Sequence, residues 1–346
     1  MRPGAGPRIG VHLKLRRGLA RAAERAGEIG ARTVQVFVDN PTAWKRRTAP
    51  PRGLDEFRTR MAELDIVPVA VHASYLVNLA GPDPGFRASS IGVLASDMAA
   101  AAGYGARLVN VHIGSHRDTS IDAGIERVAA AVAEVLARSG DSQPAAGGSP
   151  EPVLVLENAA GGGWSVGSTI EELARIAERA ASIGVAEDRL AFCIDVAHAW
   201  GAGVAMDDPT AIDRWLTSFD RELGLRRLAM IHLNDSRSER GSRTDRHEHV
   251  GAGRIGPRGL AHLLTHPSLG AVPFILETPM DDGYDAINLA RARALVAGAT
   301  LEPLPPAAFQ LKRRSAASAP ADNDIEAPAR APRAKRPGSR RPDRAA

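Results

Sequence analysis

The sequence has almost no cysteine and no long apolar run. Cys193 is the single cysteine among 346 residues, so neither an intramolecular disulfide nor a thiolate zinc site can form. No stretch of eighteen consecutive apolar residues occurs, and Met1 to Gly10 lacks the apolar core of a secretory signal. We therefore expect a cytoplasmic protein with no membrane partner, in which nitrogen and oxygen atoms hold any bound metal.

Acidic residues are also scarce at the C-terminal end. From Gln310 to Ala346 there are ten Lys or Arg residues and four Asp or Glu residues, a net charge of +6 within a total of +4. The preceding residues therefore carry a net charge of −2. This tail, rich in Ala, Pro and Arg, cannot bury enough apolar surface to fold. Its composition fits equally a solvated extension and an arm that binds phosphate backbones.

Short β-branched runs alternate with longer amphipathic segments eight times along the chain, a pattern typical of βα units. Eight such units predict an α/β fold, a closed (β/α)8 TIM barrel over residues 1–306, followed by the basic tail at 307–346. The expected strands are 8–13, 33–38, 67–72, 107–112, 153–157, 190–195, 228–233 and 273–277. The expected helices include 19–29, 89–104, 121–136, 168–181 and 284–296, with Ser168 and Glu171 fitting a capping box.

Each of the six expected strands from the third to the eighth has a histidine or a carboxylate at or next to its C-terminal end. These residues are His72, His112, Glu157, Asp195, His232 and Glu277. The C-terminal ends of barrel strands meet at one face, so the six side chains converge there. Converging carboxylates repel one another and lose hydration unless a cation neutralises them. The pattern predicts a metal site at this mouth of the barrel.

Three further residues extend the set. His198 follows Asp195 in "CIDVAHAWGAG", and Asp245 and His247 lie together in "RTDRHEHVG". The close spacing within each pair lets both side chains reach one ion. Five histidines and four carboxylates suit zinc, with manganese or iron as alternatives. Glu157 is long enough to bridge two ions.

These segments resemble the endonuclease IV family of zinc-dependent apurinic/apyrimidinic endonucleases. The similarity runs from His72 to Glu277 through "VHASYLVNLA", "VNVHIGSH", "LENAAG", "CIDVAHAWGAG", "IHLNDSRSERGSRTDRHEHVGAGRIG" and "FILETP". It implies three Zn2+ ions per chain. By this resemblance His72 and His112 bind the first zinc, and Glu157 bridges it to a second. The second is also held by Asp195, His232 and Glu277, and the third by His198, Asp245 and His247.

The resemblance also implies an activity and a partner. We expect a DNA repair enzyme that hydrolyses duplex DNA on the 5′ side of abasic sites, leaving a 3′ hydroxyl and a 5′ deoxyribose phosphate. Glu157, which bridges the ions around a zinc-held hydroxide, and Glu277 are the expected catalytic carboxylates. The enzyme is expected to be a monomer that acts on the bacterial nucleoid in the cytoplasm.

The same comparison assigns the residues that contact DNA. Tyr75 and Leu76 match the pair that wedges into the gap left by the missing base. Where family members commonly place an arginine that enters the duplex, "NPTAW" has Thr42. We therefore expect weaker engagement of DNA with unchanged zinc chemistry. Nearby, Lys45, Arg46 and Arg47 are candidates for phosphate contacts.

Two other functions fit parts of the pattern. A metal-dependent sugar isomerase or epimerase on a similar barrel also places His, Glu and Asp at strand ends, but it has no use for a third zinc triad or for Tyr75 and Leu76. A noncatalytic DNA-binding protein would leave the nine ligand candidates unexplained. Structural roles are expected for His12, packed or lining a pocket in the first strand, and for His262 and His266, on the surface of a late helix.

Overall fold

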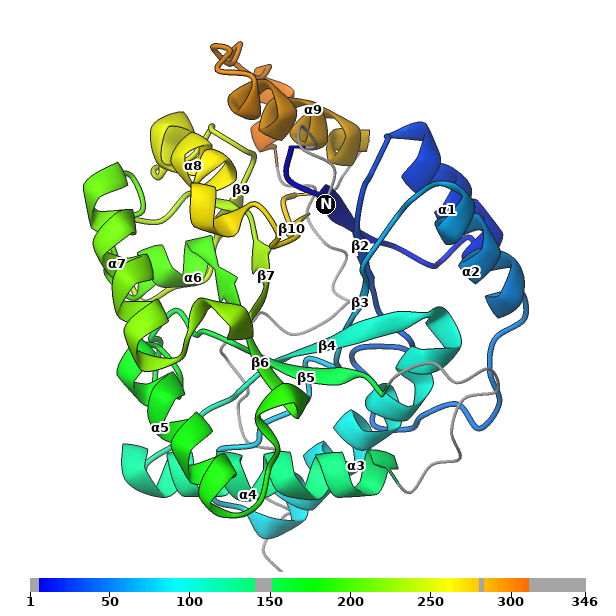
Figure 1. Ribbon diagram of the computed structural model, residues 1–346, viewed down its shortest axis with the longest axis vertical. Coiled ribbons are helices and arrows are strands. Elements are labelled where there is room, and N and C mark those ends of the chain that lie inside the picture. Colours follow the sequence, from blue (N-terminus) through cyan, green and yellow to red (C-terminus); the bar gives the residue numbers. More distant parts are fainter. Residues whose placement is uncertain (1–5, 141–150, 280–282, 311–346) are drawn as a thin grey trace, which may run out of the picture. The chain divides into compact units, whose positions relative to one another are not determined.

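The computed structural model of the chain describes residues 6–140, 151–279 and 283–310. Within them, parallel strands close into a barrel in the order β1-β10-β7-β6-β5-β4-β3-β2, with the helices arranged around the outside (Figure 1). The barrel strands are β1 (Ile9–Leu13), β2 (Val34–Val36), β3 (Val69–His72), β4 (Ala106–His112), β5 (Val153–Glu157), β6 (Leu190–Asp195), β7 (Leu228–His232) and β10 (Phe274–Leu276). The predicted (β/α)8 barrel is confirmed.

The helices that cover the barrel lie between successive strands, except α9, which follows the last strand. They are α1 (Leu19–Glu28), α2 (Leu54–Glu63), α3 (Pro84–Ala101), α4 (Ile121–Gly140), α5 (Ile170–Ser182), α6 (Val196–Gly201), α7 (Pro209–Glu222), α8 (Gly256–Thr265) and α9 (Tyr284–Val296). A short antiparallel pair, β8 (Asp235–Ser236) and β9 (His247–Glu248), shapes the connection after β7. A 3-10 turn, Pro306–Phe309, ends the described part of the chain.

Two helix starts differ from the predicted ones: α3 begins at Pro84 rather than at Ser89, and α5 begins at Ile170 rather than at Ser168. The residue before α5 is Thr169, whose side chain accepts a hydrogen bond from the backbone N–H of Glu172. The Glu172 carboxylate in turn accepts from the backbone N–H groups of Gly167 and Ser168. Because Ser-Thr offers two adjacent capping hydroxyls, the pattern also fits one residue later, and the capping box assigned to Ser168 and Glu171 is wrong.

Alternation along the strands decides which side chains enter the barrel. Ala70, Val155, Cys193, Met230 and Ile275 belong to a buried cluster inside it, separate from the main core that packs under the helices. Side chains two residues apart on a strand point to the same side. Two residues further along these five strands lie His72, Glu157, Asp195, His232 and Glu277. The polar residues therefore enter the interior at its C-terminal end for the same reason that the apolar ones fill its middle.

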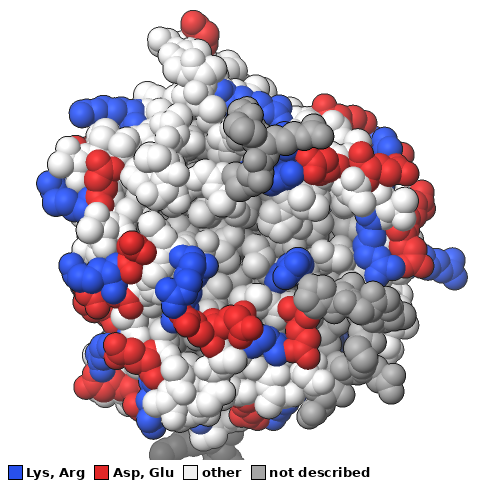
Figure 2. Space-filling model, in the orientation of Figure 1, with Lys and Arg blue, Asp and Glu red and all other residues white. Residues whose placement is uncertain are grey.

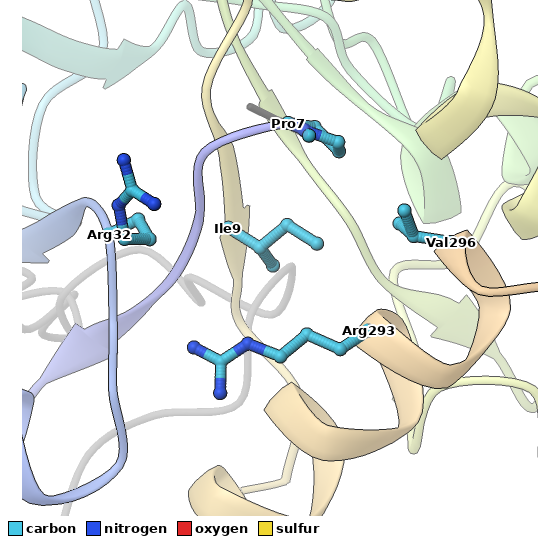
Figure 3. A pocket seen from close by; sticks show the side chains of 6 residues that line it. Pro7, Ile9, Arg32, Arg293 and Val296 are labelled. Carbon is cyan, nitrogen blue, oxygen red and sulfur yellow. The ribbon is translucent and has the colours of Figure 1, made fainter. Parts of the chain in front are cut away.

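A pocket of about 230 Å³ opens at the other end of the barrel, lined by Gly6, Pro7, Ile9, Arg32, Arg293 and Val296 (Figure 3). Ile9 begins β1, which places the pocket at the N-terminal ends of the strands. Its guanidinium groups are engaged, since Arg32 donates to Asp65 and Arg293 donates to the carbonyl oxygens of Ile29 and Gly30. This pocket is separate from the predicted metal site.

Two further properties concern the surface. On the face drawn in Figure 2, acidic and basic side chains mingle around the edge, and no large patch of one sign forms there. In the described part of the chain, no helix is both long enough and apolar enough to cross a membrane.

Candidate metal centre

Glu157 lies at the centre of the predicted cluster. Its side chain is fully buried, and its Oε1 lies 3.5 Å from His112 Nε2, 3.5 Å from His232 Nδ1 and 3.1 Å from His198 Nδ1. Oε2 lies 3.7 Å from His72 Nε2 and accepts a hydrogen bond from the amide of Asn110. Two groups of possible ligands therefore share this carboxylate: one with His72 and His112, the other with Asp195 and His232.

His232 approaches three carboxylates with one ring nitrogen. Its Nδ1 lies 3.4 Å from Glu277 Oε2, 3.5 Å from Glu157 Oε1 and 3.8 Å from Asp195 Oδ2. Neither His232 Nδ1 nor Glu157 Oε1 has a hydrogen-bond partner, although both atoms are buried. Buried polar atoms are nearly always satisfied. A cation at the point where these atoms converge would satisfy both.

A third group forms around Asp245. Its Oδ2 lies 3.1 Å from His198 Nε2, and its Oδ1 lies 2.9 Å from His247 Nε2. His247 Nε2 is also 3.5 Å from Asp195 Oδ2. His198 is placed by the start of α6, where Asp195 Oδ1 accepts its backbone N–H. His247 is placed by the β8–β9 pair, which is anchored where Asp235 accepts several backbone N–H groups.

The orientation of four imidazole rings fits metal ligation. Ring Nδ1 of His72, His198 and His247 lies 2.7, 2.8 and 2.9 Å from the carbonyl oxygens of Ala73, Asn158 and Glu277, respectively. His232 instead has its Nε2 3.1 Å from Gln35 Oε1. One ring nitrogen of each histidine is therefore held by an oxygen, which directs the other nitrogen toward the carboxylates. Metal-binding histidines are typically fixed in this way.

The pKa shifts of the clustered histidines and carboxylates also indicate a site that binds positive charge. Burial lowers the pKa of His247, but the carboxylates of Asp245 and Asp195 outweigh it and raise this pKa to about 10. The same carboxylates outweigh burial at His198 and raise its pKa well above the usual range. Burial raises the pKa of Asp245, yet His247 and His198 hold it well below the usual value. The carboxylates thus need positive charge, which either protonated imidazoles or divalent cations can provide.

The structure brings all nine predicted residues together and adds a layer of amides that the sequence analysis missed. Gln35 on β2 donates to Glu277 Oε1 and accepts from His232, and it also contacts Nδ1 of His12 at 3.0 Å. His12 Nδ1 lies 3.4 Å from Glu277 Oε1. His12 therefore lines the site, one of the two roles expected for it. The alternation rule could have found Gln35, because it lies on the inward-facing side of β2.

Two asparagines complete this layer. Asn234 Nδ2 donates to Asp195 Oδ2 at 2.6 Å, and its Oδ1 accepts the backbone N–H of Glu277 at 2.9 Å. Asn158 Oδ1 accepts the backbone N–H of Asp195 at 2.6 Å. Asn158 directly follows the last residue of β5, and Asn234 lies two residues after the last residue of β7. Because both lie outside the strands, the strand pattern alone did not distinguish them from ordinary loop residues.

The loop that carries Tyr75 lies over the cluster. The Tyr75 ring is 42% exposed, and its centroid lies 5.5 Å from that of His72 and 6.1 Å from that of His112. Ser74 Oγ and the backbone N–H of Tyr75 both donate to the carbonyl of Pro41, at 2.6 and 3.1 Å. This loop is therefore bonded to the loop with Thr42, which is exposed and donates to Asn40 Oδ1.

Arg46 is not available for the phosphate contact suggested by the sequence. Its side chain is 10% exposed, and its Nε lies 3.5 Å from the buried Asp97 Oδ1. Burial raises the pKa of Asp97 to about 6, with Arg46 opposing the rise, so the carboxylate is largely ionised at neutral pH. Asp97 also accepts the backbone N–H of Ser74. Arg46 thus ties together the Thr42 and Tyr75 loops, whereas Lys45 remains exposed.

Known proteins resemble this chain in fold, and some of them also in sequence. The chain matches the Xylose isomerase-like TIM barrel family model over residues 23–300. A D-tagatose 3-epimerase-like protein is 14% identical with a TM-score of 0.60, over 84% of this chain and 96% of that one, which concerns the fold alone. Endonuclease IV from Thermus thermophilus is 36% identical with a TM-score of 0.72, over 85% of this chain and 100% of that one.

Similarity in sequence alone leads to the same relatives. A "Probable endonuclease 4" of Methanoculleus marisnigri is 36% identical over 289 residues, which cover 83% of this chain and 98% of that protein. The alignment thus spans nearly the whole relative and most of the barrel described above. This chain belongs to the endonuclease IV family.

Proposed function

We propose that the protein is a zinc-dependent endonuclease that cleaves duplex DNA on the 5′ side of abasic sites in base excision repair. The observation that carries the proposal is the set of oriented imidazoles and carboxylates at the barrel mouth, within a chain of this family. The proposed first site is His72, His112 and Glu157. The second is Glu157, Asp195, His232 and Glu277, and the third is His198, Asp245 and His247.

Bound zinc would supply Lewis acidity to the phosphodiester and lower the pKa of a coordinated water. The residues of the chain prepare this chemistry. Asn110 and the neighbouring imidazoles fix Glu157, so this carboxylate can serve two ions without moving. Gln35 and His12 hold Glu277 in place. No side chain is needed as a nucleophile, since the attacking oxygen comes from water.

DNA would be engaged by the loops around the centre. Tyr75, exposed above His72 and His112, is in position to fill the space of a missing base and to keep bulk water from the cluster. Arg237 and Arg254 line a second pocket of about 510 Å³ beside the β8–β9 pair. Arg237 is held by the carbonyl of His247. Both guanidinium groups lie near carboxylates of the same pocket, Arg237 near Glu248 and Arg254 near Glu239, so a DNA phosphate would bind there by displacing these ion pairs.

The direct test uses a duplex with one abasic analogue and an otherwise identical undamaged duplex. Zinc-loaded protein is expected to cut only the first, on the 5′ side of the lesion, and chelation is expected to abolish the cut. Failure to cut, combined with isomerisation of a sugar by the same preparation, would establish the isomerase alternative instead.

Replacing Gln35 by Ala is expected to weaken zinc binding by about 10- to 100-fold, the range found when such supporting hydrogen bonds are removed. Gln35 fixes both His232 and Glu277, and neither bond can form with Ala. Zinc affinity would be measured by competition with a chromophoric chelator. In Gln35→Glu the acceptor for His232 is retained while Glu277 is repelled, so an intermediate affinity is expected. Equal affinity in all three proteins would contradict the role of Gln35.

Replacing Thr42 by Arg is expected to tighten binding of the abasic duplex by about tenfold, equivalent to about 1.4 kcal/mol. The position is exposed on a loop bonded to the Tyr75 loop, so a guanidinium there can reach the duplex. Fluorescence anisotropy would measure the affinity at fixed salt. Thr59→Arg, on the exposed side of α2, adds the same charge away from the mouth and serves as the control. Equal gains in both variants would show a nonspecific charge effect.

The boundary between the barrel domain, 1–306, and the basic tail, 307–346, is also a proposal, because residues 311–346 lie outside the described part. Truncation after Gln310 keeps Ala308, whose carbonyl accepts from His249, and Phe309, which packs on the same ring. We expect unchanged cleavage by the truncated protein but a shallower dependence of DNA affinity on salt, by about 0.9 per lost phosphate contact. A full-length chain with Gln at the tail's basic positions should match the truncation. Identical salt slopes for truncated and intact protein would exclude the tail from binding.

A further inference from the structure

A second group of possible metal ligands lies on the outside of the barrel, away from the mouth. Asp213 is on α7, His262 is on α8, and His266 directly follows α8. These two helices are neighbours in the outer ring (Figure 1). Among the described residues, this is the one such group that includes no member of the barrel-mouth cluster.

Both histidines point the same ring atom at the same carboxylate. His262 Nε2 lies 2.5 Å from Asp213 Oδ1, and His266 Nε2 lies 3.4 Å from that oxygen. The three potential ligand atoms lie within 4.8 Å of one another. His262 lies in the last turn of α8 and His266 is the first residue after the helix, so the end of α8 brings both imidazoles to the same carboxylate of α7. Three ligands of this kind leave a fourth, solvent-facing position for water.

Exposure differs among the three residues in a way that suits an open site. The side chains of His266 and His262 are 14% and 27% exposed, and that of Asp213 is 52% exposed. The two imidazoles are therefore largely shielded, while the carboxylate faces the solvent from which an ion would enter.

We propose that Asp213, His262 and His266 form a peripheral zinc site that links α7 to α8. One bond sets its strength. The backbone N–H of Ser268 donates to His266 Nδ1 at 3.2 Å, which places the ring proton on Nε2. Coordination through Nε2 moves this proton to Nδ1 and breaks the bond to Ser268. The loss of this hydrogen bond weakens coordination at the peripheral site, so its zinc is expected to bind after the barrel centre is full.

Such a site would stabilise the folded chain in proportion to its occupancy, because the unfolded chain cannot bring α7 and α8 together. The proposal does not depend on the reaction at the barrel mouth. Removal of the peripheral site should therefore leave cleavage of the abasic duplex unchanged, while loss of cleavage in the wild type would concern the proposed function alone.

The test starts from protein equilibrated with enough zinc to fill the barrel centre. Further zinc is added by calorimetric titration, and bound metal is counted by mass spectrometry after gel filtration. We expect the wild type to bind one more equivalent of zinc than Asp213→Asn or His262→Ala and to gain a larger increase in Tm on zinc addition. Glu222→Gln removes another exposed carboxylate of α7 and should behave like the wild type. Equal zinc content and equal Tm gain in all four proteins would overturn the proposal and leave an ordinary surface ion pair.

A fold control keeps the outcome interpretable. Variants that lose the extra zinc are expected to retain the circular dichroism spectrum and the abasic cleavage rate of the wild type. If His262→Ala destabilises α8, Asp213→Asn decides the matter, because it keeps the size of the side chain and both histidines. Retention of the extra zinc by Asp213→Asn would contradict the assignment of Asp213 as a ligand.

Discussion

Glu157→Gln is expected to reduce cleavage of an abasic duplex by about a hundred- to a thousandfold, the scale associated with loss of one preorganised electrostatic group in an active site. Burial raises the pKa of Glu157, but the charges of His112 and His232 hold it well below the usual range, so the side chain is a carboxylate at neutral pH. Glutamine has the same size but no charge, and its amide protons would face imidazole nitrogens. Single-turnover cleavage and zinc content would be measured together.

The two measurements separate ligation from folding. We expect Glu157→Gln to lose zinc as well as activity, because two of the proposed sites share this carboxylate. Glu134→Gln, which removes an exposed carboxylate paired with Arg138 on α4, should retain both. A Glu157→Gln protein that binds the full complement of zinc and cleaves at the normal rate would exclude a bridging role. Unchanged circular dichroism would show that the barrel itself persists.

The part of the site that lies on strands could be predicted because two simple rules act there together. Parallel strands in a barrel bring their C-terminal ends to one face, and side chains alternate along each strand. On β7, Met230 fills the barrel interior, so His232, two residues further on, enters the mouth. On the neighbouring strand β6, Cys193 fills the interior and Asp195 enters the mouth in the same way. The rule also covers Gln35, which was missed because an amide is not itself a typical metal ligand.

The loops carried less information in their sequence. His247 reaches the cluster through the antiparallel β8–β9 pair, and the buried Asp235 folds this connection by accepting backbone N–H groups of Gly253 and Ile255. The sequence suggested a surface cation at Arg46, which is instead paired with Asp97 from α3. Both arrangements depend on individual polar contacts between residues that are distant in the sequence. No periodic pattern in the sequence predicts such contacts.

Lowering the pH is expected to release zinc from the barrel centre steeply. Zinc requires neutral imidazoles, so each protonated histidine must lose a proton on binding. The carboxylates of Asp245 and Asp195 raise the pKa of His198 and bring that of His247 to about 10, against the lowering effect of burial. Between pH 6 and 8 the zinc-free protein therefore keeps the additional proton on His247, and the raised pKa of His198 acts in the same direction. For each proton that zinc displaces, the apparent zinc affinity should fall by about tenfold when the pH is lowered by one unit. Where both His198 and His247 release a proton, the fall should be about a hundredfold per pH unit.

The same pKa shifts give the stability of the zinc-free protein and the stabilisation by bound zinc opposite dependences on pH. A histidine whose pKa is raised on folding adds stability that is fully present below its unfolded pKa and is lost as pH rises through the folded value, which is about 10 for His247. The lowered pKa of Asp245 adds stability above its unfolded pKa, and this is lost as pH falls.

Zinc-free protein should thus lose the His247 contribution toward pH 10, while zinc binding strengthens over that range. The gain in Tm on zinc addition should therefore increase from pH 6 to 8, with calorimetry in two buffers counting the protons released. A gain in Tm that does not change with pH, together with no proton release, would show that the imidazoles are already neutral and that the carboxylates do not hold them protonated.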